Sequence, residues 1–505
     1  MTEPEIAIGI DIGTSPCRVS VWKGTQEGVG RMVFLPISNF PFLMHTLDIK
    51  VRPFIATIAN KACRSTTAVE LLEKFLVKLK FSVEIQVKRP IRKVVFTVPV
   101  SFTRLQRTRI ERASAWADLD DVELMPQPIA VALFYAQQQL QTSASSLEDM
   151  NNERKNIALV FNMDAGYCDV AVIAAEKGKL RIKALRGSPI GREDLLENMI
   201  CHLLPVSKNI FKKRVHEDRE IKLMARIRNT VHEVITQLSS QTSVEFDLEM
   251  GDGSKIHKVV EREEFEEVKK EVFEKGERLI IQCLQDAKVD VESINDVIIV
   301  GECCNIPRVK NLVTTICKGK ELYKGTVNPL NAALRGAAMA GANSLGTGFR
   351  NLELLNFHVT LHTIGIRVNG NKFVPVIPRN TSRPAMRSAV FTTIHDYQTE
   401  ALIVVFEGEG EKAEETHHWG YYIITEIPAA TKGVPEITVC LTIDHENWLT
   451  VIASVRMHGY EQYDIPVTQA TMTFFEEGPL CLCDDSLIRS YGDTAGLVTL
   501  FNKEQ

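Results

Sequence analysis

The chain has 505 residues, enough for two to four domains with substantial cores. Its composition is 45% hydrophobic and 24% charged, as in ordinary globular proteins, and its net charge of −5 gives no electrostatic reason to expect nucleic acid or an anionic membrane as a partner. The acidic N-terminus does not resemble a signal peptide, no apolar run is long enough to span a bilayer, and the scattered cysteines favour reduced thiols. We therefore expect a cytosolic protein.

Two stretches of the chain, residues 6–22 and 157–173, are predicted to be copies of one structural unit. Each consists of an apolar strand, a turn of small residues and an alternating apolar strand, a pattern typical of a β-hairpin. In an ungapped alignment Asp11 falls on Asn162. Small turn residues let backbone N–H groups approach an anion, so two facing hairpins could grip the phosphates of a nucleotide from both sides. The alternative is that such units are common and the similarity is accidental.

The elements that follow alternate between helix and strand up to about residue 345. Periodicity and capping signals predict helices at residues 66–80, 103–117, 129–140, 195–204, 221–238, 262–288, 307–317 and 336–341. Strands are predicted at residues 94–98, 244–248 and 297–300. Residues 141–156, rich in Ser, Asn and charge, are expected to link two halves, residues 1–150 and 151–345.

Beyond this point only strands are predicted. Residues 346–356 have the composition of a linker but carry an apolar run. The predicted strands lie at residues 373–377, 402–406, 437–443 and 451–455, with a hairpin turn at Asn369–Gly370. We therefore expect a smaller all-β domain over residues 357–465, followed by a tail, residues 466–505, without strong periodicity.

Several motifs, in order, resemble the Hsp70 chaperone family. In the α/β half these are Asp11–Ser15, Val95–Phe102, Pro128–Tyr135, Gly191–Asp194, Val300–Gly301, Ile306–Pro307, Val327–Pro329 and Gly336–Ala338. In the β half they are Arg379–Thr381, Phe406–Glu409, Ile427–Pro428, Lys432–Pro435 and Ile443–Asp444. An actin or a sugar kinase would not carry the β half. The chain is identified as a divergent, short, plant-type member of the family that lacks the helical lid.

The resemblance implies an α/β fold, namely a duplicated actin-like (ribonuclease H-like) nucleotide-binding domain of two lobes, followed by an all-β sandwich peptide-binding domain. It implies ATP or ADP with Mg²⁺ as cofactor and a chaperone function in the stress response. The implied partners are unfolded or extended polypeptide clients, J-domain co-chaperones and nucleotide exchange factors, with no nucleic acid and no membrane.

The family's functional residues are carried over position by position. Catalysis and metal binding fall on Asp11 and Asp169. Nucleotide contacts fall on Gly13, Thr14, Ser15, Gly166, Tyr167, Gly191, Glu193, Ser239 and Gly301. Peptide contacts fall on Ile366, Val368, Phe391, Ala401 and Ile403, with an arch over the peptide at Asn369 and Ile394. The alternative for the peptide set is ordinary sandwich core.

The departures from the family fall on the chemistry. Most of the segment that carries the family's catalytic lysine is absent. Gln127 and Asn162 replace acidic residues, Asp164 enters the second phosphate loop, and Arg192 and Glu302 replace glycines. Trp448 replaces a smaller aliphatic residue. An unneutralised Asp164 near a phosphate would cost ~4 kcal/mol at an effective dielectric constant of about 20. We expect hydrolysis to be weak or lost; the alternative is a pseudo-ATPase holdase or adaptor without nucleotide cycling.

Overall fold

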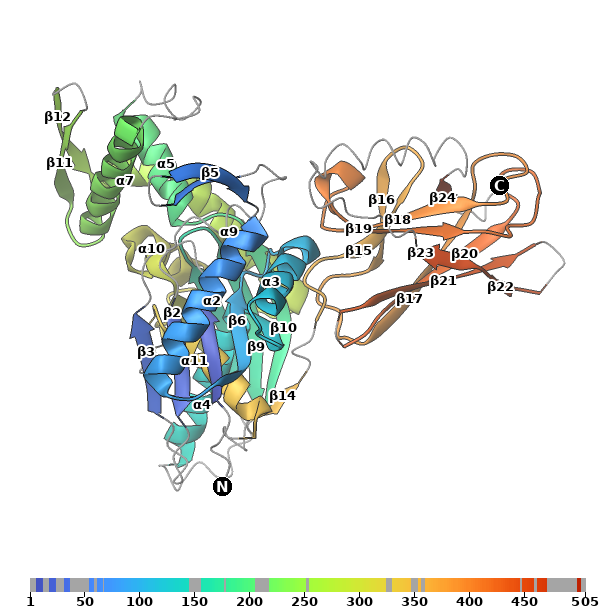
Figure 1. Ribbon diagram of the computed structural model, residues 1–505, viewed down its shortest axis with the longest axis horizontal. Helices are drawn as coiled ribbons and strands as arrows, with labels where there is room; N and C mark the ends of the chain where they lie inside the picture. Colours follow the sequence, from blue (N-terminus) through green and yellow to red (C-terminus); the bar gives the residue numbers. More distant parts are fainter. Residues whose placement is uncertain are drawn as a thin grey trace. The chain divides into compact units, whose positions relative to one another are not determined.

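The computed structural model divides the chain into two compact units (Figure 1). Unit 1 comprises residues 1–44, 79–101 and 119–355, and unit 2 comprises residues 45–78, 102–118 and 356–505. The structure describes residues 6–11, 18–23, 31–36, 54–58, 61–66, 68–144, 156–176, 179–204, 218–250, 254–323, 329–346, 353–355, 359–445, 447–457, 461–469 and 497–500.

Unit 1 contains two five-stranded sheets that share four strands in the same order, β3-β2-β1-β6 in one and β10-β9-β8-β13 in the other; the fifth strand, β7 or β14, lies at opposite ends. Their strand orders are β3-β2-β1-β6-β7 and β13-β8-β9-β10-β14. The strands are β1 Ile6–Asp11, β2 Arg18–Lys23, β3 Arg31–Pro36, β6 Ile91–Val98, β7 Asp121–Pro126, β8 Asn156–Met163, β9 Cys168–Glu176, β10 Lys179–Ser188, β13 Asp296–Val300 and β14 Glu353–Leu355. In each sheet an antiparallel hairpin, β1–β2 or β8–β9, is followed by a strand parallel to its first strand, β6 or β13.

The two predicted hairpins are confirmed and share one register. Asp11 pairs with Arg18 at the turn end of the first hairpin, and Asn162 pairs with Asp169 at the same place in the second. These are equivalent positions of the ungapped alignment. The similarity of the two sequence stretches is therefore structural rather than accidental.

Helices α4, α9 and α11 pack against these sheets. The α-helices of the described residues are α2 Ala68–Val87, α3 Arg104–Trp116, α4 Gln127–Ala144, α5 Arg192–Leu203, α7 Asp218–Leu238, α8 Arg262–Val268, α9 Lys270–Ala287, α10 Pro307–Ile316 and α11 Ala332–Ser344. A hairpin of β11 Ser243–Glu249 and β12 Lys255–Glu261 stands apart from the large sheets. The capping box predicted at Thr103 and Gln106 is present, as is Pro307 at the first turn of α10.

Two predictions about these helices were wrong. Residues 262–288 do not form one helix, because Lys269 leaves the helical conformation between α8 and α9 and is fully buried. The lysine Nζ donates to the carbonyl oxygen of Asp194 at 3.4 Å, and burial lowers its pKa to about 7. The expected link at residues 141–156 begins later than predicted, since α4 continues to Ala144.

Unit 2 contains a β-sandwich of two five-stranded sheets. Their orders are β16-β15-β18-β19-β23 and β22-β21-β20-β17-β24. The strands are β15 Ile364–Val368, β16 Lys372–Ile377, β17 Ala385–Thr393, β18 Ala401–Glu407, β19 His417–Ile424, β20 Glu436–Ile443, β21 Leu449–Arg456, β22 Tyr463–Ile465, β23 Val467–Gln469 and β24 Val498–Leu500. A separate pair, β4 Phe54–Ile58 and β5 Lys61–Thr66, also falls in this unit. Sequence periodicity missed several of the sandwich strands, including β23 and β24 in the tail.

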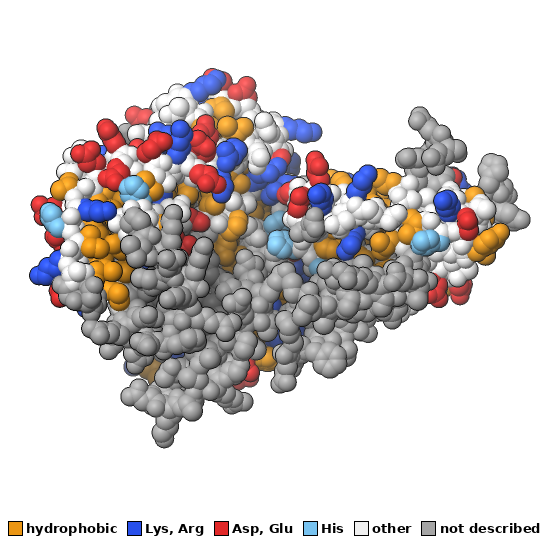
Figure 2. All heavy atoms as spheres, turned by 90° about the horizontal axis from the view of Figure 1, so that it is seen from above, with side chains coloured by type: hydrophobic (Ala, Val, Ile, Leu, Met, Phe, Trp, Pro, Cys, Tyr) orange, Lys and Arg blue, Asp and Glu red, His pale blue; other side chains and the backbone are white. Residues whose placement is uncertain are grey.

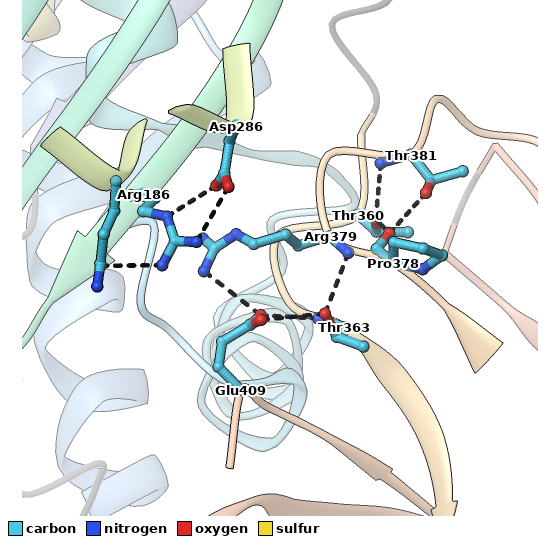
Figure 3. A network of polar contacts seen from close by, with 9 residues as sticks. Arg186, Asp286, Thr360, Thr363, Pro378, Arg379, Thr381 and Glu409 are labelled. Carbon is cyan, nitrogen blue, oxygen red and sulfur yellow. Dashed lines mark hydrogen bonds and ion pairs between the residues drawn. The ribbon is translucent and has the colours of Figure 1, made fainter. Parts of the chain in front are cut away.

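One end of the sandwich is tied by residues of the resemblance motifs. The Glu409 carboxylate accepts hydrogen bonds from the backbone N and the hydroxyl of Thr363, at 3.0 and 3.1 Å, and forms an ion pair of 3.3 Å with Arg379 (Figure 3). The Thr360 and Thr381 hydroxyls both donate to the carbonyl oxygen of Pro378. These motif residues therefore serve the fold of unit 2. A separate ion pair of unit 1, Arg186–Asp286, appears in the same view at 2.7 Å.

The surface carries charges of both signs. On the face shown in Figure 2, acidic and basic side chains are intermingled over the described parts. Among the described residues, no helix is both long enough and apolar enough to cross a membrane.

Candidate functional site

A chain of hydrogen bonds joins the two hairpins of unit 1. Asp11, at the end of β1, accepts from the Thr97 hydroxyl at 2.6 Å and from Gln127 Nε2 at 3.2 Å. Gln127 Oε1 in turn accepts from Asn162 Nδ2, at the end of β8, at 2.8 Å. All four side chains are buried. The two positions where acidic residues are replaced are thus neighbours in space and bonded to each other.

The amide character of Gln127 and Asn162 makes this chain possible. An ionised carboxylate only accepts hydrogen bonds, whereas an amide both donates and accepts. Three carboxylates at these positions would repel one another unless a cation lay between them. With Gln127 and Asn162 in place, Asp11 is the one ionisable member of the chain, and its carboxylate is satisfied by neutral donors.

Asp169 is the second residue predicted to bind metal. It is fully buried on β9, and its Oδ1 accepts from the backbone N of Val100 at 3.1 Å. Carboxylate oxygens are the ligands that Mg²⁺ prefers, so Asp11 and Asp169 are the residues that would hold it. Within the described part of the chain, no cluster of three or more His, Cys, Asp or Glu side chains is arranged to bind a metal.

The turn between β8 and β9, predicted to be the second phosphate loop, packs tightly onto the start of α5. The backbone N of Arg192 donates to the Asp164 carbonyl at 3.0 Å, and that of Glu193 donates to the Ala165 carbonyl at 2.7 Å. A side chain at Gly191 would lie 2.4 Å from the Asp164 carbonyl oxygen, which requires glycine there. The backbone amides of Arg192 and Glu193, of the kind that can hold an anion at a helix N-terminus, are therefore already bonded to this turn. The same turn contains the predicted contacts Gly166 and Tyr167.

Asp164 itself carries less charge than expected. Burial and the carboxylates of Asp11 and Glu302 raise the pKa of Asp164, while Arg18 acts in the opposite direction. The raised pKa favours the protonated, uncharged form of this side chain. The repulsion toward a phosphate predicted from the sequence is correspondingly reduced.

The two glycine replacements pair with each other. Arg192 Nη1 forms an ion pair with Glu302 Oε2, and Glu302 Oε1 lies 3.4 Å from Arg18 Nη2. Arg192 Nη2 lies 3.6 Å from Glu193, which also pairs with Arg228 on α7. These side chains are between 13% and 25% exposed, so their charges are poorly screened. We call these five residues the ion-pair chain; it connects β2, the loop after β13, α5 and α7.

Of the remaining residues predicted to contact the nucleotide, the structure describes Gly301 and Ser239. Gly301 has φ +93°, and a side chain there would lie 2.4 Å from the Met163 carbonyl oxygen. The Ser239 hydroxyl donates to the Ile235 carbonyl at 3.4 Å. Gly13, Thr14 and Ser15 lie outside the described residues.

The predicted peptide contacts gather in unit 2. The five residues Ile366, Val368, Phe391, Ala401 and Ile403 belong to one buried core cluster. Both arch positions lie at turns: Asn369 is exposed after β15, and Ile394, after β17, donates its backbone N to Gln398 Oε1 at 3.0 Å. Five of the seven residues thus lie together in the sandwich core, as the alternative expected, and peptide contact remains a prediction.

Trp448 has a partner that the sequence did not reveal. The Arg104 guanidinium lies over the rings of Trp419 and Trp448, with distances to the ring centroids of 4.9 and 5.7 Å. Its Nη1 donates to the Asn447 carbonyl at 2.7 Å, and its backbone N donates to Glu407 at 2.5 Å. These contacts attach the start of α3 to the sandwich within unit 2.

Sequence reasoning missed Arg18, Arg228 and Arg104. No spacing signal marks them, because each acts through a partner at least 35 positions away in the chain. The sequence offered one signal: Arg192 and Glu302, which carry opposite charges, both stand where the resemblance gives glycine.

The duplicated sheets of unit 1 and the sandwich of unit 2 are the arrangement that the resemblance implied. The family model for Hsp70 protein matches residues 37–477. Heat shock 70 kDa protein 8 of Arabidopsis thaliana is 44% identical over 99% of this chain and 95% of that protein. The chain belongs to the Hsp70 family.

More distant relatives agree. The chaperone protein DnaK of Thermotoga maritima is 31% identical over 78% of this chain and 65% of that protein. A heat shock 70 kDa protein of Neurospora crassa is 28% identical over 83% of this chain and 63% of that protein. The chain therefore spans less than two thirds of the length of these two relatives, but nearly the whole of the Arabidopsis protein.

Proposed function

We propose that this Hsp70-family chain is an ATP-binding chaperone that binds extended apolar segments of unfolded proteins, with ATP hydrolysis slow or lost. J-domain co-chaperones and nucleotide exchange factors are its proposed partners, and the cytosol is its proposed location. Family membership supports the chaperone function. The buried Asn162–Gln127–Asp11 hydrogen-bond chain carries the proposal of slow turnover.

The physical reason lies in what phosphoryl transfer requires. The reaction needs metal ions that bridge the phosphates, a positioned water and stabilised negative charge. Gln127 and Asn162 can neither take a proton from water nor neutralise Mg²⁺, and their polar atoms already bond to each other. Because catalytic groups act as a unit, losing two of them leaves little for the rest to contribute.

A second candidate is a holdase or adaptor that works without nucleotide, and the ion-pair chain favours it. By the resemblance, Arg192 and Glu302 occupy positions where the family has glycines that let the nucleotide approach, and the two side chains form an ion pair. A half-buried ion pair resists separation, because removing either partner leaves an uncompensated charge. A nucleotide would have to displace this pair or accommodate it.

Calorimetric titration of ATP with Mg²⁺ into the full chain, followed by single-turnover hydrolysis, decides between the candidates. Micromolar binding with measurable turnover rejects the second, and millimolar or absent binding rejects the first. The double variant Arg192→Gly/Glu302→Gly removes the pair and is expected to tighten ATP binding at least ~10-fold, equivalent to ~1.4 kcal/mol.

The matched control removes a different ion pair of the same unit. Arg186→Ala/Asp286→Ala breaks the 2.7 Å pair between β10 and α9 and is expected to leave the ATP affinity within about two-fold of the wild type. If both double variants change the affinity equally, the effect is global and the role of Arg192 and Glu302 is rejected.

A further inference from the structure

The C-terminal strand β24, Val498–Leu500, runs antiparallel along the end of β17. Phe391 pairs with Leu500, Thr392 with Thr499 and Thr393 with Val498. β24 is only three residues long and lies at the edge of its sheet (Figure 1). An extended segment added to an exposed sheet edge is one of the recurring ways in which proteins bind peptides.

Two turns hold this strand through its carbonyl groups. The backbone N of Asn369, after β15, donates to the Val498 carbonyl at 3.0 Å. Gln398 Nε2, before β18, donates to the Leu497 carbonyl at 3.3 Å. Gln398 is held in place for this role, because its Oε1 accepts from the backbone N of Ile394 at 3.0 Å and its Nε2 also donates to the Glu400 carbonyl at 2.8 Å. Contacts to backbone carbonyls do not depend on the side chains of the bound segment.

One side chain of the strand is fully enclosed. Val498 is 0% exposed and belongs to the same core cluster as the predicted peptide contacts Ile366, Val368, Phe391, Ala401 and Ile403. Leu500 is 46% exposed and lies outside that cluster. One buried aliphatic side chain between main-chain contacts is the combination expected for an extended apolar peptide in its site.

We propose that residues 497–500 are an internal ligand of the peptide site, so that a client segment binds by displacing β24. This inference rests on the peptide-binding function proposed above and specifies its ligand: an extended segment with a β-branched aliphatic residue at the enclosed position. The backbone of that segment is held by the amide of Asn369 and the side chain of Gln398, and by pairing with β17.

The size of the effect follows from tethering. A ligand tethered to its own site reaches an effective concentration on the order of millimolar. If the free segment binds with a dissociation constant on the order of 0.1 mM, the tethered strand lowers the apparent affinity for an added peptide about ten-fold. Freeing the site therefore strengthens client binding by about that factor.

The test measures anisotropy of a fluorescein-labelled peptide spanning residues 494–503 (TAGLVTLFNK) with the full chain and its variants. Val498→Asp is expected to bind this peptide about ten-fold more tightly than the wild type, because the charged residue cannot occupy the core cluster. Leu500→Asp, the same change at the exposed position, is expected to remain within about two-fold of the wild type. A peptide carrying aspartate in place of the valine should not bind any of the three proteins.

A second measurement keeps the inference testable if Val498→Asp fails to fold. Hydrogen exchange of the wild-type chain is expected to show protected amides at residues 498–500 that lose protection when the valine peptide saturates the site. If peptide binds while these amides stay protected, or if Val498→Asp binds it no better than wild type, β24 is a structural strand and the inference is wrong. If wild type dimerises and Val498→Asp does not, the strand is exchanged between copies, which also overturns it. If no variant binds any peptide, the proposed function itself fails.

Discussion

Single residues in this chain explain its departures from the Hsp70 pattern. Arg192 and Glu302 read in the sequence as two separate losses of glycine, but in the structure they neutralise each other. Gln127 and Asn162 likewise form one hydrogen bond rather than two defects. Each replacement is compensated by another, so these sites are rebuilt around new contacts. The polar groups of these residues are therefore satisfied within the folded chain.

Glu407 provides the clearest pH dependence. It is buried beneath the start of α3, and burial raises its pKa from 4.5 to about 7, while Arg104 and Arg107 act in the opposite direction. Between these two pH values the folded chain holds a proton that the unfolded chain has lost. The stability contribution of Glu407 is therefore highest at acid pH, falls as pH rises from about 4.5 to 7, and is level above that.

We expect Glu407→Gln to remove this dependence, because glutamine keeps the acceptor for the Arg104 backbone N without a titratable proton. Relative to the variant, the wild type should lose roughly 2–3 kcal/mol of unfolding free energy between about pH 5 and about pH 8. Urea unfolding followed by tryptophan fluorescence measures the difference. Glu461→Gln, at an exposed position, should track the wild type; parallel curves for wild type and Glu407→Gln would contradict the assignment.

At the scale of elements, two glycines, Gly336 on α11 and Gly9 on β1, show how closely α11 packs against its neighbours. Helix α11 lies directly on α4 and β1. A side chain added at Gly336 would lie 1.7 Å from the Ala130 carbonyl oxygen, and one at Gly9 would lie 2.7 Å from the Ala338 backbone N. The Gly336–Gly341 segment predicted to be a tightly packed small-residue helix is confirmed in that role.

Two glycines in helix interiors of unit 1, Gly336 and Gly276, differ in how closely their surroundings pack. Gly336→Ala is expected to prevent folding or to cost more than ~3 kcal/mol, since backbone would have to move. Gly276→Ala in α9, where the nearest atom is 3.9 Å away, should stabilise by ~0.5–1 kcal/mol through helix propensity. Thermal and urea unfolding give both values. Equal effects at the two positions would show that propensity, not packing, governs α11.

At the scale of the whole molecule, the reactivity of the free cysteines depends on how deeply each one is buried. Among the described residues, Cys201 and Cys440 are partly exposed, whereas five cysteines are buried: Cys168, Cys283, Cys303, Cys304 and Cys317. Burial raises the pKa of the Cys168 and Cys303 thiols, which further lowers their reactivity.

We therefore expect iodoacetamide to modify Cys201 and Cys440 in the native chain at least ~10-fold faster than the five buried thiols. Peptide mass spectrometry after timed quenching gives the rates, and urea-unfolded chain is the control in which all seven of these cysteines should react alike. Fast modification of Cys168 in the native chain would show that the β8–β9 hairpin opens readily and would contradict the described core.

The sequence by itself determined the hairpins, most helices and the order of the two halves, because each depends on local periodicity and capping. It also identified the family and the positions where the chain is predicted to depart from the family's nucleotide site. Only the tertiary structure decided what those positions do. Hydrogen bonds and ion pairs between distant segments make Gln127 a partner of Asn162, and Arg192 a partner of Glu302. The same holds for β24, whose three residues carry no periodic signal and become a strand only when β17 supplies its hydrogen bonds.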